Sequence, residues 1–154
     1  MVGIEPSHVH EGLWLGSCPR SPEDFEVLAG LGVTDVVSLI PPDEAGVTGL
    51  QPTVAFRLAV ASGLKLHSGA IRDFSHRELA ARLPVAVAAL SDLLGAGRVV
   101  YLHCAHGFNR SPTVAAAWLA TARAVDAVVA CAQLQALRQC APDVDAVKAF
   151  LRER

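Results

Sequence analysis

The sequence predicts a single α/β domain, on the evidence of its segment pattern, its composition and its charge. Short apolar segments alternate with amphipathic ones, and no linker or composition change divides the chain, so residues 1–154 form one expected domain. Apolar residues make up 52% of the chain and charged residues only 18%, which excludes intrinsic disorder and predicts a well-buried core. The net charge of −2 does not fit binding through a broad basic surface, so no nucleic-acid partner is expected.

In the first half of the chain, the pattern predicts strands at 8–10 and 13–16, a helix from 21 to about 30, a strand at 33–40, a loop at 43–49, a helix at 51–61 and a strand at 64–67. A turn at Gly12 separates the first two strands. Ser21 is expected to cap the first helix, because Pro22 suits the first helical position and acidic residues follow it. Two prolines end the apolar run at 33–40.

In the second half, the pattern predicts helices between 75 and 95, a strand at 98–103, and helices at 112–123, 126–139 and 143–151. Leucines and a valine spaced three or four residues apart form one apolar face between 79 and 94. Pro84 lies inside this run, so we expect a break there, with Pro84 opening a second helix. The strand at 98–103 is continuously apolar, as in a central strand that is covered on both faces.

The four cysteines are too few and too scattered for a disulfide framework in a domain of this size. Cys131 and Cys140 are interpreted as small buried hydrophobic residues, whereas Cys18 is a candidate for a reversible disulfide with Cys104. No signal peptide is recognised, and polar residues interrupt every apolar run before the roughly 20 residues that cross a bilayer. We therefore expect a cytoplasmic protein that does not bind membranes.

The segment 103–112 contains the residues that indicate a chemical function. The predicted strand ends at Cys104, a short loop follows, and Arg110 opens a helix. Such a loop directs successive backbone N–H groups into one concavity, and the helix dipole adds positive potential there. Arg110 offers a planar fork for two phosphate oxygens, and Gly107 and Asn109 tolerate the left-handed turns that curl the loop. The expected phosphate-binding residues are Ala105, His106, Gly107, Phe108, Asn109 and Arg110.

Cys104, at the bottom of this cradle, is the expected nucleophile in its thiolate form, and it would form a covalent thiophosphate. Asp73, in a loop before the long helix, is the candidate general acid for the leaving oxygen and then the base for the attacking water. Ser111 is placed to hydrogen-bond the departing sulfur, and His103 to hold the loop and tune the thiolate through backbone contacts. Arg110 and the loop amides carry the transition-state charge, so no cofactor is expected.

A metal site is the alternative for the same segment, because His103, Cys104 and His106 are all potential ligands. No fourth ligand follows at a suitable spacing, so we expect no metal.

The loop has the pattern His-Cys, two residues, Gly, two residues, Arg-Ser, and it thereby resembles the cysteine-dependent dual-specificity phosphatases. The residues that carry this signature are His103, Cys104, Gly107, Arg110 and Ser111. Five further segments are similar to the catalytic domain of plant glucan phosphatases related to laforin: Leu15–Cys18, Pro22–Asp24, Ile71–Phe74, Arg82–Pro84 and Tyr101–Cys104. The resemblance implies a single mixed, mainly parallel central sheet flanked by helices on both faces, and it also assigns the general acid to Asp73.

The main function prediction is a phosphatase that hydrolyses phosphate monoesters through Cys104, with phosphotyrosine as the main substrate and phosphoserine and phosphothreonine as lesser ones. The expected partner is therefore a phosphoprotein, and the protein is expected to be a monomer. The first alternative is a glucan phosphatase acting on phosphorylated starch or glycogen, for which Phe74 and Phe108 are the aromatic residues placed near the pocket. The second is a non-catalytic module that retains the cradle and binds phosphorylated partners.

Overall fold

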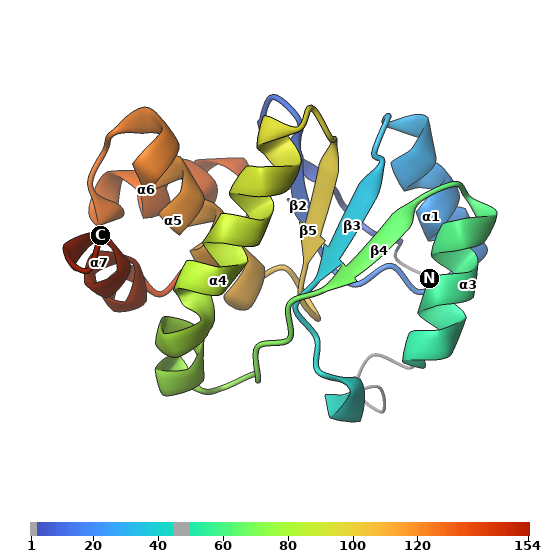
Figure 1. Ribbon diagram of the computed structural model, residues 1–154, viewed down its shortest axis with the longest axis horizontal. Coiled ribbons are helices and arrows are strands. Elements are labelled where there is room, and N and C mark those ends of the chain that lie inside the picture. The colour runs from blue at the N-terminus through green and yellow to red at the C-terminus, as the bar shows by residue number, and fades with distance from the viewer. Residues whose placement is uncertain (1–2, 45–49) are drawn as a thin grey trace.

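The computed structural model describes residues 3–44 and 50–154. Within these residues, a five-stranded sheet with the strand order β1-β2-β5-β3-β4 forms the centre of the fold (Figure 1). Its strands are β1 (Ser7–His10), β2 (Leu13–Gly16), β3 (Asp35–Ser38), β4 (Lys65–Ser68) and β5 (Val100–His103). The pair β1–β2 is antiparallel and the three other pairs are parallel, which confirms the expected mixed, mainly parallel sheet.

Helices cover both faces of this sheet, as Figure 1 shows. One face carries α1 (Pro22–Gly30) and α3 (Pro52–Ala61), and the other carries α4 (His76–Gly95), α5 (Arg110–Arg123), α6 (Ala127–Leu137) and α7 (Val144–Arg152). A short 3₁₀ helix, η1 (Pro42–Glu44), follows β3. It holds the first two residues of the loop expected at 43–49, and the others lie outside the described residues. In the described part of the chain, no helix is both long and apolar enough to span a bilayer.

The central strand β5 has all four of its side chains buried, as its apolar sequence predicted. Val100 and Leu102 belong to the core beneath α4–α7, whereas Tyr101 packs with Phe25 and Leu28 in a second core beneath α1 and α3. Because successive side chains of a strand point to opposite faces of the sheet, β5 contributes residues to both cores. The end of β5 is fixed in the middle of the molecule, and this end leads into the segment 103–112.

The break that we expected at Pro84 is wrong, because α4 runs without interruption from one side of this proline to the other. Proline cannot donate the hydrogen bond that a helix interior requires, and this loss normally bends or ends a helix. Here the same apolar stripe is buried on both sides of Pro84, which itself faces solvent. Packing of both halves against one core outweighs the missing hydrogen bond. The buried residues of the stripe are Leu79, Leu83, Val87 and Leu90.

Replacing Pro84 with alanine should stabilise the protein, because alanine restores the N–H donor at an exposed helical position. We expect the free energy of unfolding to rise by about 1–3 kcal/mol in the Pro84→Ala variant, as measured by urea denaturation. Val85→Ala, at the next exposed position, is the matched control and should change it by less than about 0.7 kcal/mol. Equal stability of Pro84→Ala and the wild type would contradict this explanation.

Candidate active site

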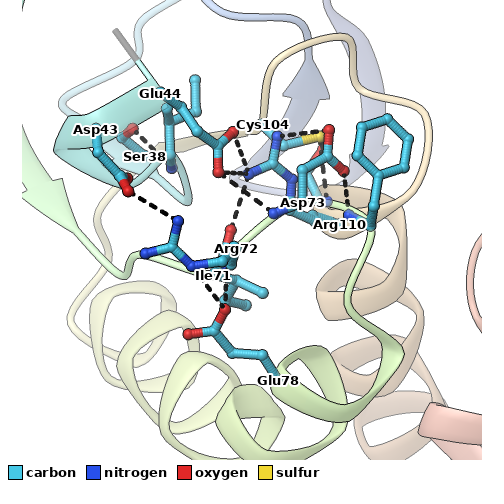
Figure 2. A network of polar contacts seen from close by, with 12 residues as sticks. Ser38, Asp43, Glu44, Ile71, Arg72, Asp73, Glu78, Cys104 and Arg110 are labelled. Atoms are coloured by element: carbon cyan, nitrogen blue, oxygen red, sulfur yellow. Dashed lines mark hydrogen bonds and ion pairs between the residues drawn. The ribbon is translucent and has the colours of Figure 1, made fainter.

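The predicted site residues meet at the carboxyl ends of the parallel strands, where open α/β sheets commonly bind ligands. Strand β5 ends at His103, Cys104 follows, and α5 begins at Arg110. We call residues 104–110 the catalytic loop. Asp73 reaches it from the segment between β4 and α4, as Figure 2 shows.

Four carbonyl groups of the catalytic loop point outward, each to a partner outside the loop. Ala105 accepts a hydrogen bond from the N–H of Cys18 at 3.1 Å, Gly107 from Arg138 Nε at 3.1 Å, Phe108 from the N–H of Ala141 at 2.7 Å, and Asn109 from Thr113 Oγ1 at 2.6 Å. In a trans peptide the C=O and the following N–H point in opposite directions. Outward carbonyls therefore turn the loop N–H groups inward, which creates a concavity that suits an anion.

The sulfur of Cys104 lies at the base of this concavity, where its side chain is buried. It is 3.2 Å from Ser111 Oγ and 3.5 Å from the backbone N of Ser111, in the first turn of α5. The contact between Ser111 and the sulfur that the sequence suggested is therefore present. Both groups can donate a hydrogen bond to a sulfur that carries negative charge.

Arg110 is buried, and the protein holds it mainly by one nitrogen (Figure 2). Its Nη1 donates to the carbonyl oxygen of Ile71 at 2.8 Å and to the Glu44 carboxylate at 3.0 and 3.3 Å. Its Nη2 lies 3.4 Å from Asp73 Oδ2. Because the strongest contacts use Nη1, the opposite edge of the guanidinium can serve as a fork for two phosphate oxygens.

Glu44 is a site residue that we did not expect from the sequence. Besides binding Arg110, its carboxylate accepts the backbone N–H of Asp73 at 3.3 Å, so it connects the arginine with the candidate general acid. It ends η1 directly after Pro42 and Asp43, where an acidic residue is an ordinary turn residue. The contact spans 66 residues of sequence, and no local signal announces it.

Asp73 is partly buried, and its Oδ1 accepts the N–H of the following residue, Phe74, at 3.0 Å. Phe74 has a left-handed backbone with φ of 57° and a side chain that is 99% exposed. The structure thus brings Asp73 to the same pocket as Cys104, and its role in proton transfer stays a prediction.

A pocket of about 690 Å³ opens over Cys104. It is lined by Asp73, Phe74, Ser75, His76, Cys104, Ala105, His106, Phe108, Asn109, Arg110, Ala141 and Asp143. Of the six expected phosphate-binding residues, only Gly107 does not line it. Its φ is 68°, and a Cβ there would lie 2.8 Å from Arg138 Nη2 and from the carbonyl carbon of Gly16. Glycine is needed at this position because the backbone packs directly against β2 and Arg138.

The far rim of the pocket contains an ion pair between His76 and Asp143, which the sequence did not suggest. His76 lies in the first turn of α4, and Asp143 is the N-cap of α7. The hydrogen bond that His76 Nδ1–H donates to the Asp143 carboxylate, together with the negative charge of that carboxylate, raises the pKa of His76 above its usual value. The pair therefore joins the start of α4, three residues after Asp73, to the segment that follows α6.

Cys18 lies beside the catalytic loop, because its backbone N–H binds the carbonyl of Ala105. Burial raises the pKa of its thiol to about 11, so this thiol is neutral at physiological pH. Both Cys18 and Cys104 are free thiols in this structure, and the disulfide between them stays a prediction.

His103 is buried, and its Nδ1 lies 3.1 Å from the carbonyl oxygen of Cys104. Burial lowers the pKa of His103 to about 4; the charge of Arg110 acts in the same direction, and the bond to Cys104 opposes it. The ring is therefore neutral at pH 7, and its Nδ1–H can donate to that carbonyl. This is the backbone contact that we expected of His103.

The chain matches the family model "Dual specificity phosphatase, catalytic domain" over residues 13–153, and it therefore belongs to this family of phosphatases. It is 31% identical over 149 residues to "Phosphoglucan phosphatase DSP4, amyloplastic" of Castanea sativa, covering 96% of this chain and 40% of that protein. It is 32% identical over 124 residues to laforin of Mus musculus, covering 73% of this chain and 38% of laforin. The chain thus spans less than half the length of these two relatives.

Solved structures share the fold. The crystal structure of PTPMT1 in complex with PI(5)P superposes with a TM-score of 0.80, covering 96% of this chain and 95% of that one at 19% sequence identity. This likeness confirms the architecture that the resemblance implied.

Removing the charge of Glu44 should impair the site without changing its shape. We expect Glu44→Gln to lower kcat/KM for an aryl phosphate by about 10- to 100-fold, because charge-assisted hydrogen bonds fix the guanidinium of Arg110. Asp43→Asn is the matched control in the same turn, since Asp43 pairs instead with the exposed Arg72. It should change kcat/KM by less than about 2-fold. Similar losses in both variants would show that the turn as a whole matters, rather than the Glu44 carboxylate.

Burial of neutral His103 should make stability depend on pH. The pKa of His103 is about 4 in the folded protein and 6.5 in the unfolded chain, so the unfolded chain binds the proton more readily between these values. The contribution of the neutral ring to the free energy of unfolding is therefore complete above pH 6.5 and is lost as the pH falls toward 4. The loss approaches about 1.4 kcal/mol per pH unit. Urea denaturation between pH 7 and 4 should therefore show a shallower decline for His103→Gln than for the wild type. His8→Gln, at an exposed position, is the control and should decline in parallel with the wild type.

Proposed function

We propose that this domain hydrolyses phosphate monoesters through a covalent thiophosphate on Cys104. The observation that carries the proposal is the sulfur of Cys104 at the base of a pocket that Arg110 and Asp73 also line. A phosphate group bound there would direct its oxygens to the inward N–H groups of the catalytic loop and to the edge of Arg110 opposite Nη1. Asp73, 3.4 Å from Arg110, would stand near the ester oxygen.

In the first step, the sulfur of Cys104 attacks phosphorus in line with the ester bond, and the S–P bond forms as the P–O bond breaks. Asp73 gives its proton to the leaving oxygen, which departs as an alcohol or a phenol. In the second step, a water molecule attacks phosphorus, Asp73 takes up a proton from it, and the S–P bond breaks. Ser111 Oγ, 3.2 Å from the sulfur, donates a hydrogen bond to the thiolate as it leaves.

We propose phosphotyrosine as the main substrate, with phosphoserine and phosphothreonine as lesser ones. Two exposed phenyl rings support this choice, because Phe74 and Phe108 both line the pocket and their side chains are 99% and 48% exposed. Aromatic rings pack favourably against one another in stacked or edge-to-face arrangements. A phosphorylated tyrosine that reaches Cys104 would pass between the residues of this rim.

A phosphorylated glucan is the second candidate substrate. The similarity to a phosphoglucan phosphatase and to laforin, at 31% and 32% identity, favours it. The third reading, a non-catalytic phosphate-binding module, has less support, because the nucleophile, the arginine and the candidate acid all line one pocket.

A cytoplasmic location is also a proposal. All four cysteines are free thiols, which suits a reducing compartment.

The deciding experiment compares kcat/KM for a phosphotyrosine peptide and for phosphorylated amylopectin, with Cys104→Ser as the blank. We expect turnover of the peptide to be preferred and to fall below about 1% in Cys104→Ser, because serine is a far weaker nucleophile than a cysteine thiolate. A clear preference for amylopectin would establish the glucan alternative. Tight binding of the peptide without turnover of either substrate would establish the non-catalytic module.

A further inference from the structure

Arg138 joins the N-terminal segment, with the first residue of β1, and strand β2 to the catalytic loop. It is the C-cap of α6, and its side chain is half-buried. Its Nε donates to the carbonyl of Gly107 at 3.1 Å. Its Nη1 donates to the carbonyl of Glu5 at 2.9 Å, to Ser7 Oγ at 3.1 Å and to the carbonyl of Leu15 at 3.2 Å. The N-terminal segment, strand β2 and the catalytic loop are therefore held by one guanidinium group.

The bond to Gly107 fixes the direction of one peptide group. With the carbonyl of Gly107 held outward, the N–H of Phe108 in the same peptide must point toward the pocket. The segment after α6 orients the next peptide group in the same way, because the N–H of Ala141 donates to the carbonyl oxygen of Phe108 at 2.7 Å. Asn109 Nδ2 binds back to the carbonyl of Ala141 at 2.9 Å. Residues 138–141 thus orient the second half of the loop from outside.

Arginine is well suited to this position. Its planar guanidinium holds its N–H donors in a rigid arrangement. The single N–H of Nε serves Gly107, and the two N–H groups of Nη1 are shared among the acceptors on Glu5, Ser7 and Leu15. A lysine has a single flexible ammonium group and cannot reproduce this geometry. The close packing of Gly107 against Arg138 and Gly16 leaves little space in which the peptide could move.

We propose that Arg138 is a positioning residue for oxyanion binding: it holds the Gly107–Phe108 peptide with its N–H toward the phosphate site. Without this arginine, the peptide can rotate and present the carbonyl oxygen of Gly107 to the anion, which is repulsive. The proposal rests on the proposed function in one respect, namely that the catalytic loop binds a phosphate group. Arg138 is not among the residues that line the pocket over Cys104, so it acts through its bond to the loop.

The test separates positioning from general stability by comparing two arginines. Arg123, near the end of α5, binds the carbonyl of Val9 and His10 Nδ1 at 3.3 Å and Gln133 Oε1 at 2.7 Å. It therefore fastens a helix end to β1 much as Arg138 fastens one to β2, without contacting the catalytic loop. Arg123→Gln is thus the matched control for Arg138→Gln.

The measurement is the dissociation constant of orthovanadate by titration calorimetry, with the melting temperature recorded for each variant. We expect Arg138→Gln to weaken vanadate binding by about 10-fold or more, because small misplacements of binding groups have large effects. Arg123→Gln should leave the affinity within about 2-fold, whatever its melting temperature. Arg138→Lys, which retains the charge, should fold and show an intermediate loss, and it carries the test if Arg138→Gln does not fold.

Unchanged vanadate affinity in a folded Arg138 variant would overturn the proposal and leave Arg138 with a structural role alone. Failure of the proposed function gives a different result. If the wild type binds vanadate but hydrolyses no ester, the catalytic function falls while the affinity difference between the Arg138 and Arg123 variants still decides the role of Arg138. If the wild type binds no vanadate, both fall together.

Discussion

The outward direction of the carbonyl groups in the catalytic loop is the constraint on which the site depends. Four of these carbonyl groups have a donor outside the loop, and the fold supplies these donors from separate places. Cys18 follows β2, Thr113 lies in α5, and Arg138 and Ala141 lie in the segment between α6 and α7. Because the carbonyls are satisfied outside, the N–H groups can remain available to an anion inside.

The second constraint is the burial of a positive charge. A buried guanidinium is costly unless carboxylates and carbonyl groups surround it. Glu44, Asp73 and the carbonyl of Ile71 meet this need for Arg110, and they also set its orientation. The same contacts bring the candidate general acid to the arginine. Satisfying one buried charge therefore assembles two parts of the expected catalytic machinery, from segments that precede and follow β4.

The loop bears on which family the chain belongs to, whereas the rim of the pocket bears on which substrate it accepts. The loop, with Cys104 and Arg110, lies within residues 13–153, which match the phosphatase family to which the chain belongs. The rim is built from the start of α4 and the segment after α6, where His76 pairs with Asp143 and Phe74 projects into solvent. Rims of this kind bear on which phosphate ester enters, because the substrate beyond its phosphate group contacts them.

The sequence by itself determined the features that are local. Cys104, Arg110 and Ser111 lie within eight consecutive residues at the junction of a strand and a helix, so the order of residue types was sufficient to bring them together. The alternation of apolar segments likewise indicated the sheet and most helices. Asp73 could be placed because it follows a strand and precedes a long helix.

Tertiary structure alone decided the contacts between distant segments. Glu44 meets Arg110 across 66 residues, His76 meets Asp143 across 67, and Arg138 meets Gly107 across 31. Glu44, His76 and Arg138 are charged or polar residues of ordinary surface types. The role of each arises only from the residue that the folded chain places beside it. Tertiary structure also decided that α4 is unbroken. An interior proline disfavours a helix locally, but packing of the apolar face of α4 on the core outweighs this effect.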